Sequence, residues 1–383
     1  MDICVINPFF YPYLGGTEKV LLQVYSRLAK KHNITVISGH SERGKDTTTE
    51  HMHGIKIIRL KTRYVDLPVS PLPFMWMDGV QSRIIKEKAD VYHINNRYLY
   101  YGRTILAIKA IRRKFVLTIH NSLPRNIDFP TNFSGYVYDK AWSRSMMAMA
   151  DAITGVSKDA IDVTVPNRMH GKCSVIYNGV DSKLFKPHGK KDSKVRRLLK
   201  EFGNPDRLVL NNARLVPQKG QAYLMNAVSE LAKERKERIH LAIIGRGPME
   251  NKLRAHAHAL GLDFDIVSGI PEPVLPYYYN ASDAFVLPSL YEPAGAALLE
   301  ALSCETPSLA THIGGIPEYM KGYGFYVQDR SSDSIKKSLS EVFDNPARAD
   351  SLSKRARMVM IKEHNWNNIA RQYEDVFLGL SRR

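Results

Sequence analysis

Short apolar runs of strand length alternate with longer helical stretches along nearly the whole chain. This alternation limits the available folds more than any other feature. In the first half the apolar runs lie at 3–7, 34–38, 55–60, 91–94, 115–119, 152–156 and 174–177. The pattern then restarts at 208–212, 240–244, 264–267, 284–287, 308–310 and 324–327. Because strands that alternate with helices form parallel β/α units, the sequence predicts an α/β protein with two Rossmann-like sheets.

The length supports the same division, since 383 residues at roughly 150 per domain correspond to two domains. A polar segment at 181–194, which contains Pro187 and several lysines, separates the two series and is typical of a linker. We therefore expect an N-terminal domain of residues 1–185 and a C-terminal domain of residues 186–365.

Three helical segments are predicted after the last strand, at about 331–344, 347–362 and 366–381. One domain's outer layer needs fewer helices than this. We therefore expect residues 366–383 to form a terminal helix that packs back on the first domain.

The charge is unusual, with 55 Lys and Arg against 38 Asp and Glu and a net charge of +17. Residues 1–185 hold 26 of these cations against 15 anions, so +11 of the excess lies in the first half. A basic surface favours nucleic acid, anionic lipid or a phosphorylated substrate as partner, and charge alone does not choose among them.

The sequence contains neither a membrane-spanning run of about 20 apolar residues nor the pattern of an export signal, because it opens directly into a strand. We expect a cytoplasmic protein. Its three cysteines are widely spaced and lack a CxxC, so neither a disulfide framework nor a zinc site is predicted.

The first candidate site is the run GGTE at 15–18, which follows the first strand and opens a helix. Gly15 and Gly16 would let backbone N–H groups approach a phosphate at the helix N-terminus. The alternative is a plain turn with Thr17 as N-cap. The run is not a GxGxxG fingerprint, which disfavours an NAD or FAD enzyme.

The second candidate follows the first strand of the second half, where Arg214 and Lys219 lie in one loop. Two cations there can bracket a diphosphate and neutralise charge on a departing phosphate oxygen. The alternative is a solvated loop. Gly245 and Gly247 form a further glycine turn after the next strand, and we assign them to donor binding on this weaker signal.

The most specific candidate is the pair Glu292 and Glu300. We expect Pro293 at the first helical position and N–H groups of Gly295 and Ala296 exposed at the helix start. Eight helical residues span about 12 Å, so one carboxylate would meet a sugar ring and the other a ribose. The alternative is structural, with Glu292 favourable to the helix dipole and Glu300 an exposed helix residue.

Two histidines and an acidic pair complete the candidates. His120 ends a strand at its carboxyl end and is a candidate catalytic residue, whereas His93 lies inside a strand. Asp263 and Asp265 have the DxD form of a metal–nucleotide site, but they introduce a strand away from the expected loops, which favours a structural role.

Together these motifs resemble those of glycosyltransferase family 4, the retaining GT-B enzymes, in order and spacing across nearly the whole chain. The matching segments are GGTE at 15–18, YNGVD at 177–181, NARLVPQKG at 212–220, IGRGP at 244–248, EPAGAALLEAL at 292–302 and GGIPE at 314–318. The resemblance implies a GT-B fold, in which two Rossmann-like domains face each other across a cleft. It also implies a nucleotide-sugar bound mainly by the second domain and an acceptor bound mainly by the first.

The resemblance further implies a metal-independent hexosyltransferase with no cofactor besides a UDP- or GDP-linked sugar. Arg214 and Lys219 would neutralise the diphosphate, Glu300 would bind the ribose hydroxyls, and Glu292 would bind the sugar hydroxyls with the amides beside it. The anomeric configuration would be retained by front-face attack through an oxocarbenium-like state, without an established protein nucleophile. Ala294 departs from the family, which often has Phe there, so the transferred sugar is not predicted.

Several alternatives stay open. A nucleotide-sugar epimerase or hydrolase on the same fold would need no acceptor. A non-catalytic glycan-binding subunit is another alternative. A nucleic-acid-binding protein would explain the charge but not the paired glutamates, and no nucleic-acid-binding signature is present, so we expect no nucleic-acid partner.

The expected acceptor is a glycan or a lipid-linked sugar, and its binding residues are not predicted. Residues 103–114 favour a basic amphipathic helix, and the loop 67–77 carries aromatic residues suited to an interface. We therefore expect the first domain to contact an anionic membrane, at the inner membrane face. The alternative is an ordinary outer helix and a loop that closes over the acceptor.

Overall fold

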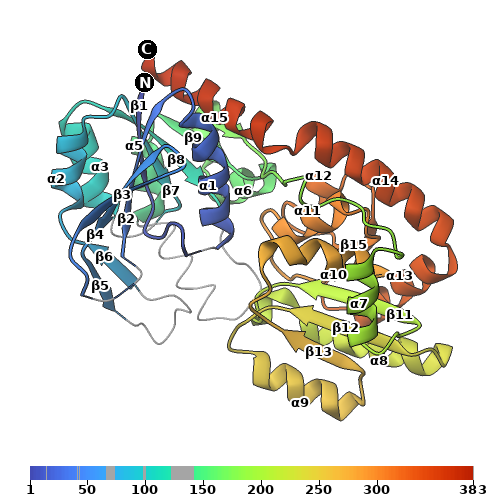
Figure 1. The fold of residues 1–383 in the computed structure, drawn as a ribbon. Helices are drawn as coiled ribbons and strands as arrows, with labels where there is room; N and C mark the ends of the chain where they lie inside the picture. Colours follow the sequence, from blue (N-terminus) through green and yellow to red (C-terminus); the bar gives the residue numbers. More distant parts are fainter. Residues whose placement is uncertain are drawn as a thin grey trace. The chain divides into compact units, whose positions relative to one another are not determined.

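The computed structural model describes residues 1–13, 15–40, 42, 44–65, 74–97, 101–121 and 142–382. These residues form two compact units, each built on its own sheet (Figure 1). The first unit comprises the described part of residues 1–178 together with residues 366–382, and the second comprises Gly179–Asn365.

The sheet of the first unit has the strand order β10-β9-β8-β7-β1-β2-β4-β3. All of its pairs are parallel apart from β3 with β4. The strands are β1 (Asp2–Ile6), β2 (Asn33–Gly39), β3 (Thr48–Met52), β4 (Ile55–Leu60), β7 (Val91–Asn95), β8 (Lys114–Ile119), β9 (Ala152–Gly155) and β10 (Cys173–Val175). The chain leaves β1 toward one edge and β7 toward the other, so the topological switch point lies between these two strands.

The helices of the first unit alternate with these strands as the sequence predicts. They are α1 (Gly16–Leu28), α2 (Val80–Glu87), α3 (Tyr101–Ala110), α5 (Arg144–Met149), α6 (Lys158–Thr164), the 3₁₀ helix η2 (Asn167–Lys172) and α15 (Trp366–Ser381). The predicted helix over 103–114 is too long. The chain turns at Arg112, which has φ +53°, and Lys114 already belongs to β8.

The sequence patterns did not reveal β3 or the hairpin of β5 (Thr62–Val65) and β6 (Phe74–Met77). β3 is exposed on an edge and therefore lacks an apolar run. Most of the loop predicted at 67–77 lies outside the described residues. Only its last part, β6, is described.

The sheet of the second unit has the order β13-β12-β11-β14-β15-β16, and all of its pairs are parallel. The strands are β11 (Arg207–Asn212), β12 (Ile239–Ile244), β13 (Phe264–Val267), β14 (Ala284–Leu287), β15 (Ser308–Thr311) and β16 (Phe325–Val327). In chain order this is the arrangement 3-2-1-4-5-6 of a dinucleotide-binding sheet, with the switch point between β11 and β14.

Helices cover both faces of this second sheet (Figure 1). They are α7 (Ser193–Glu201), α8 (Gln221–Arg235), α9 (Glu250–Leu260), α10 (Leu275–Ala281), α11 (Ala296–Ser303), α12 (Ile316–Met320), α13 (Ser332–Asp344) and α14 (Pro346–Glu363), with the 3₁₀ helices η3 (Pro217–Lys219) and η4 (Glu272–Val274). The core beneath them is aliphatic, with Val209, Leu241 and Val286 from the central strands fully buried. The three segments predicted after β16 correspond to α13, α14 and α15.

The segment expected to be a linker packs as part of the second unit. Phe185 is fully buried, and its carbonyl oxygen accepts a hydrogen bond from Ser303 Oγ at 2.7 Å. The backbone N–H of His188 donates to Asn280 Oδ1 at 2.5 Å. Because these contacts bind the segment to α10 and α11, the division falls between Asn178 and Gly179, earlier than the expected boundary near residue 186.

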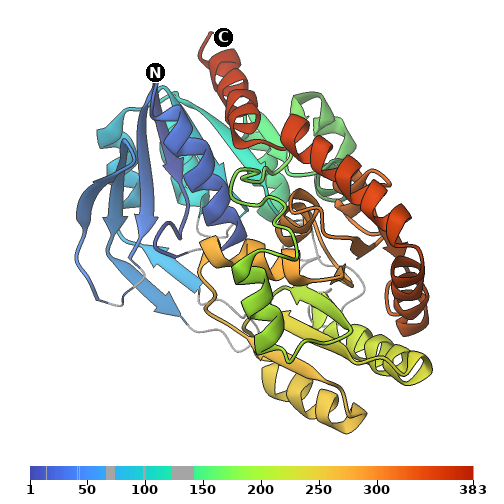
Figure 2. The same cartoon turned by 45° about the vertical axis from the view of Figure 1, so that its right-hand side comes forward.

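The C-terminal helix α15 belongs to the first unit, where it packs against α1 (Figure 2). Its Trp366, Tyr373 and Phe377 join the same apolar cluster as Val24 and Leu28 of α1. The helix therefore completes the core of the unit in which the chain begins.

A buried polar chain lies under α15. Tyr25 is hydrogen-bonded to His93 Nδ1, and His93 Nε2 lies 2.5 Å from Thr118 Oγ1. The rings of Tyr373 and Phe377 each lie 5.5 Å from the His93 ring. Burial lowers the pKa of His93 to about 3, with the nearby His120 as a smaller cause, so His93 is neutral in the folded protein.

We predict that His93 makes the first unit less stable in acid. Below its ordinary pKa of 6.5, the histidine takes up a proton in the unfolded chain but not in the folded one, down to about pH 3. The part of the unfolding free energy that depends on neutral His93 is thus fully present above pH 6.5 and is lost as the pH is lowered toward 3. Between pH 6 and 4, His93→Asn should reduce the pH slope of the unfolding free energy by about 1.4 kcal/mol per pH unit.

Urea unfolding followed by tryptophan fluorescence measures this slope, because Trp76, Trp142 and Trp366 all lie in the first unit. His51→Asn is the matched control, since His51 is exposed. A slope that is the same in His93→Asn as in the wild type would contradict the assignment.

Candidate functional site

Two loops leave the carboxyl ends of β11 and β14, the strands that flank the switch point of the second sheet. One carries Arg214 and Lys219, and the other carries Glu292 and Gly295. Ligands of doubly wound sheets bind at this position, because the loops from the two strands separate there and leave room between them. The two strongest sequence candidates therefore lie where the topology favours a site.

Lys219 and Glu292 join these loops by an ion pair, in which Lys219 Nζ donates to Glu292 Oε2. Their side chains are only 15% and 11% exposed. The other oxygen of Glu292 accepts the backbone N–H of Gly295 at 3.0 Å, and Ser289 Oγ lies 3.5 Å from Oε2. Such a pair is held by directed hydrogen bonds as well as by charge.

The helix after Glu292 begins later than the sequence predicts. Gly295 has φ +71° and is the N-cap of α11, whose first residue is Ala296. Pro293 therefore does not occupy the first helical position, and Glu292 precedes the helix. The estimate of eight helical residues between Glu292 and Glu300 was wrong for this reason.

Glu300 is 7% exposed, so the alternative of an exposed helix residue is wrong. Its Oε2 accepts a hydrogen bond from the hydroxyl of Tyr279 at 2.8 Å, and Asn212 Nδ2 donates to the same hydroxyl at 2.9 Å. Sequence reasoning did not identify Tyr279, because a tyrosine in an apolar helix is usually a core residue.

Arg214 is exposed, while its loop is fixed by backbone contacts to the glycine turn after β12. The N–H of Leu215 donates to the carbonyl of Arg246 at 2.9 Å. A Cβ on Gly245 would collide with the carbonyl of Ala213, and one on Gly247 would collide with the carbonyl of Leu215. These glycines thus have a packing role, and their assignment to donor binding stays a prediction.

The glycine turn of the first unit forms the start of α1. Gly15 is the N-cap, so the alternative with Thr17 in that position is wrong. Space around a Cβ at Gly16 is open, whereas a Cβ at Gly15 would collide with Glu18 Oε2. Burial raises the pKa of Glu18, although hydrogen bonds from its own N–H, the Asn7 side chain and the N–H of Gly15 oppose the shift. The Glu18 side chain therefore stabilises the turn through hydrogen bonds within the first unit.

His120 lies after β8 beside the switch point of the first sheet. Its Nε2 lies 3.0 Å from Asn95 Oδ1, and its backbone N–H donates to Asn96 Oδ1 at 3.3 Å. Since an amide oxygen only accepts, Nε2 carries the proton and Nδ1 is an acceptor. Burial lowers the pKa of His120 to about 3, so the ring is a neutral acceptor near neutral pH.

The DxD pair lies at the start of β13, at the end of the second sheet opposite to the loops that carry Lys219 and Glu292. Asp263 accepts from His240 Nδ1 at 2.9 Å and from Arg238 Nε at 2.7 Å, and Asp265 lies 3.4 Å from His240 Nε2. Within the described ranges, no cluster of three His, Cys, Asp or Glu side chains is placed to hold a metal ion. The arrangement fits the structural role predicted for the DxD pair.

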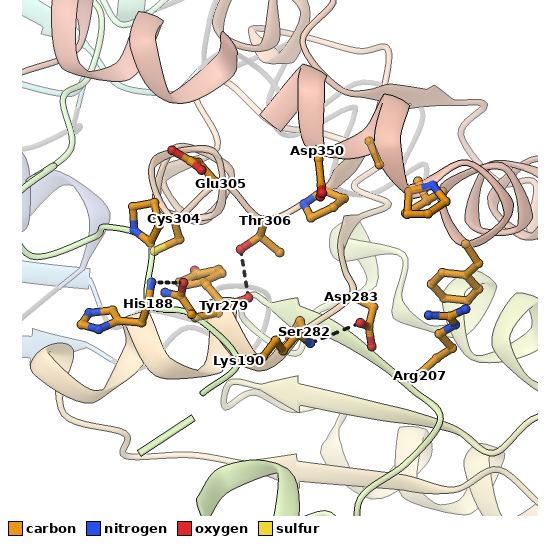
Figure 3. Close-up of a pocket in the computed structure, with 18 residues that line it drawn as sticks. His188, Lys190, Arg207, Tyr279, Ser282, Asp283, Cys304, Glu305, Thr306 and Asp350 are labelled. Carbon is orange, nitrogen blue, oxygen red and sulfur yellow. Dashed lines mark hydrogen bonds and ion pairs between the residues drawn. The ribbon is translucent and has the colours of Figure 1, made fainter. Parts of the chain in front are cut away.

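A separate cavity of about 290 Å³ lies at the amino ends of β11, β14 and β15 (Figure 3). Lys190 and Asp283, which form an ion pair at 3.2 Å, line it together with Thr306 and Tyr279. It is therefore distinct from the loops at the carboxyl ends of the strands.

Family models match both halves of the chain. The model of Glycosyltransferase Family 4 matches residues 14–184, and that of Glycosyl transferases group 1 matches residues 196–359. A GDP-mannose-dependent alpha-(1-6)-phosphatidylinositol monomannoside mannosyltransferase of Mycolicibacterium smegmatis is 30% identical, covering 97% of this chain and 96% of its own length. An uncharacterized glycosyltransferase of Methanocaldococcus jannaschii, MJ1607, is 28% identical over 55% of each chain.

Solved structures share the fold over the whole length. A glycosyltransferase from Rickettsia africae has a TM-score of 0.77 at 20% identity, covering 99% of this chain and 98% of its own. Anabaena HepE in complex with UDP-glucose also has a TM-score of 0.77, at 18% identity, with 99% and 100% covered. The fold is GT-B, and the chain belongs to glycosyltransferase family 4, with a C-terminal half of the glycosyl transferases group 1 type.

Proposed function

We propose that this glycosyltransferase moves a sugar from a nucleoside-diphosphate sugar to a glycan or lipid-linked acceptor, with retention at the anomeric carbon. The observation that carries the proposal is the ion pair of Lys219 with Glu292 at the switch point of the second sheet. It joins a cation suited to a diphosphate and a carboxylate suited to sugar hydroxyls in one buried place.

The proposed chemistry follows from where charge develops. As the bond from the anomeric carbon to the diphosphate breaks, negative charge grows on the phosphate oxygens, and a fixed cation lowers the energy of that state more than that of the substrate. Lys219 would supply this charge, with the exposed Arg214 as the second cation. Glu292 would then accept hydrogen bonds from the sugar hydroxyls instead of from Lys219, beside the N–H groups of Gly295 and Ala296.

The remaining contacts are proposed from position and chemistry. Glu300, held by Tyr279, would accept hydrogen bonds from the ribose hydroxyls. His120 would accept a hydrogen bond from a substrate hydroxyl through Nδ1. The roles of Gly15 and Gly16 toward a phosphate rest on the open space beside Gly16 and on the family pattern, and they stay predictions.

An epimerase or hydrolase is the second candidate function, and dependence on an acceptor distinguishes it. The names of the relatives favour transfer: one is GDP-mannose-dependent and acts on a phosphatidylinositol mannoside, and Anabaena HepE was crystallised with UDP-glucose. The assay therefore offers UDP- and GDP-linked sugars with and without glycan and lipid-linked acceptors. Release of free sugar at the same rate without acceptor would favour the hydrolase.

We predict that transfer depends on both cations. Lys219→Ala and Arg214→Ala should each lower kcat by roughly 10²–10³, the usual cost of removing one group that stabilises developing negative charge. The donor KM should rise less than kcat falls, because the contact strengthens in the transition state. Steady-state kinetics with the best donor and acceptor from the panel measures both constants.

Lys252→Ala is the matched control, since Lys252 is an exposed lysine of α9 in the same unit. Wild-type turnover in either test variant, with an unchanged circular dichroism spectrum, would overturn the assignment. The reactions are run in excess EDTA, because the proposed mechanism needs no divalent cation. Loss of wild-type activity there, with recovery on adding manganese, would contradict metal independence.

We also propose that the first unit contacts an anionic membrane through α2 and α3. Among the described residues, no helix is both long and apolar enough to cross a membrane. Ile85 on α2 and Leu106 on α3 are 50% and 61% exposed, and the two helices are neighbours. The exposed Arg103 lies over the Trp76 ring at 5.9 Å, and basic residues with apolar side chains favour an interface.

We predict that the protein co-sediments with liposomes more strongly as their phosphatidylglycerol content rises. Binding should fall as salt is raised from about 0.05 to 0.5 M, because screening shortens the reach of surface charge. Leu106→Ser should weaken binding, while Met358→Ser, at a 65% exposed position of α14, should leave it unchanged. Binding that ignores lipid charge, salt and Leu106→Ser would favour an acceptor in solution.

A further inference from the structure

The hydroxyl of Tyr279 lies between two polar side chains from other elements. It donates to Glu300 Oε2 on α11 at 2.8 Å and accepts from Asn212 Nδ2, at the end of β11, at 2.9 Å. Tyr279 itself is fully buried on α10. The end of β11 and the helices α10 and α11 are thus connected through one oxygen atom.

The direction of these bonds is determined by chemistry. A phenol has one proton to donate, and only the carboxylate can receive it, since the Asn212 amide nitrogen is itself a donor. Burial raises the pKa of Tyr279 well above its ordinary value of 10, and the charge of Glu300 raises it further. The hydroxyl therefore stays protonated near neutral pH and donates to Glu300.

Tyr279 is itself held in place. Its ring makes edge contacts with Phe185 and Phe285, at centroid distances of 6.1 and 5.6 Å. Its carbonyl oxygen accepts a hydrogen bond from Thr306 Oγ1 at 2.9 Å (Figure 3). The phenol is thus a fixed group, whereas a glutamate without such a partner rotates about its last side-chain bond.

We propose that Tyr279 is a positioning residue for nucleotide recognition, which orients the Glu300 carboxylate toward the two ribose hydroxyls of the donor. The inference rests on the proposed function, in which Glu300 binds the ribose. With Oε2 held by the phenol, the plane of the carboxylate is fixed, and so are the directions of its other lone pairs. A carboxylate that is already oriented loses less entropy when it binds a diol.

A purely structural role is the competing explanation, because a buried tyrosine that connects three elements also stabilises the fold. The two explanations differ in one measurable respect. Loss of a structural tyrosine weakens the binding of every nucleotide alike. Loss of a positioning tyrosine weakens the binding of nucleotides that carry ribose hydroxyls and spares those that lack them.

The test compares UDP and GDP with their 2′,3′-dideoxy analogues by isothermal titration calorimetry on the full chain. The wild type should bind the better ribonucleotide about tenfold or more tightly than its dideoxy analogue, as expected for hydrogen bonds to a charged group. Tyr279→Phe should reduce this ratio by about 3- to 10-fold, and Glu300→Gln should bring it close to one. Tyr278→Phe, the neighbouring tyrosine on α10, is the matched control and should keep the full ratio.

A second readout is the split between donor KM and kcat. Tyr279→Phe should raise the donor KM by about 3- to 10-fold with kcat within about twofold, because the ribose contact is equal in the substrate and the transition state. If Tyr279→Phe does not fold, Asn212→Ala removes the other bond to the phenol and should shift the ratio in the same direction.

The outcomes distinguish a failure of the positioning role from a failure of the proposed function. A full ratio in Tyr279→Phe, or in the Asn212→Ala substitute, together with a lost ratio in Glu300→Gln, overturns the positioning role and leaves the proposed function intact. A wild type that binds neither ribonucleotide overturns both. A wild type that binds the dideoxy analogue equally well overturns the ribose contact of Glu300 and, with it, the positioning role of Tyr279.

Discussion

The ion pair between Lys219 and Glu292 is the interaction on which the candidate site depends. It connects loops that leave β11 and β14, and it keeps two largely buried charges from standing unpaired, which would cost several kcal/mol. The N–H of Gly295 holds the second oxygen of Glu292 and so ties the start of α11 to the same pair. We propose that a bound diphosphate takes over part of the charge pairing that the carboxylate now supplies to Lys219.

The strand order explains why these residues meet. With β11 and β14 adjacent and their crossovers on opposite sides, only loops at this point of the sheet diverge and leave room. The alternation of apolar runs predicted the strands, because each run that it places in the second unit is a strand, but it did not predict their order in the sheet. It missed β3, which is exposed on an edge and lacks an apolar run. It also missed the hairpin of β5 and β6, whose strands have only four residues each.

Side-chain partners were harder to predict than elements. The pattern at 292–302 identified both glutamates, but it placed the start of the helix at Pro293, whereas the left-handed Gly295 delays the start to Ala296. Gly245 and Gly247 look like phosphate-binding glycines in the sequence, yet the backbone of Ala213 and Leu215 occupies the space that a Cβ would need. Tyr279 became visible only once β11, α10 and α11 were brought together, because its importance comes from contacts distant in sequence.

A crystal structure of the chain with UDP or GDP would show which partner Lys219 takes when a nucleotide is bound. We expect Lys219 Nζ to lie within hydrogen-bond distance of a β-phosphate oxygen and the Glu300 carboxylate to accept hydrogen bonds from the ribose hydroxyls. A nucleotide bound elsewhere, with Lys219 still paired only to Glu292, would contradict this expectation.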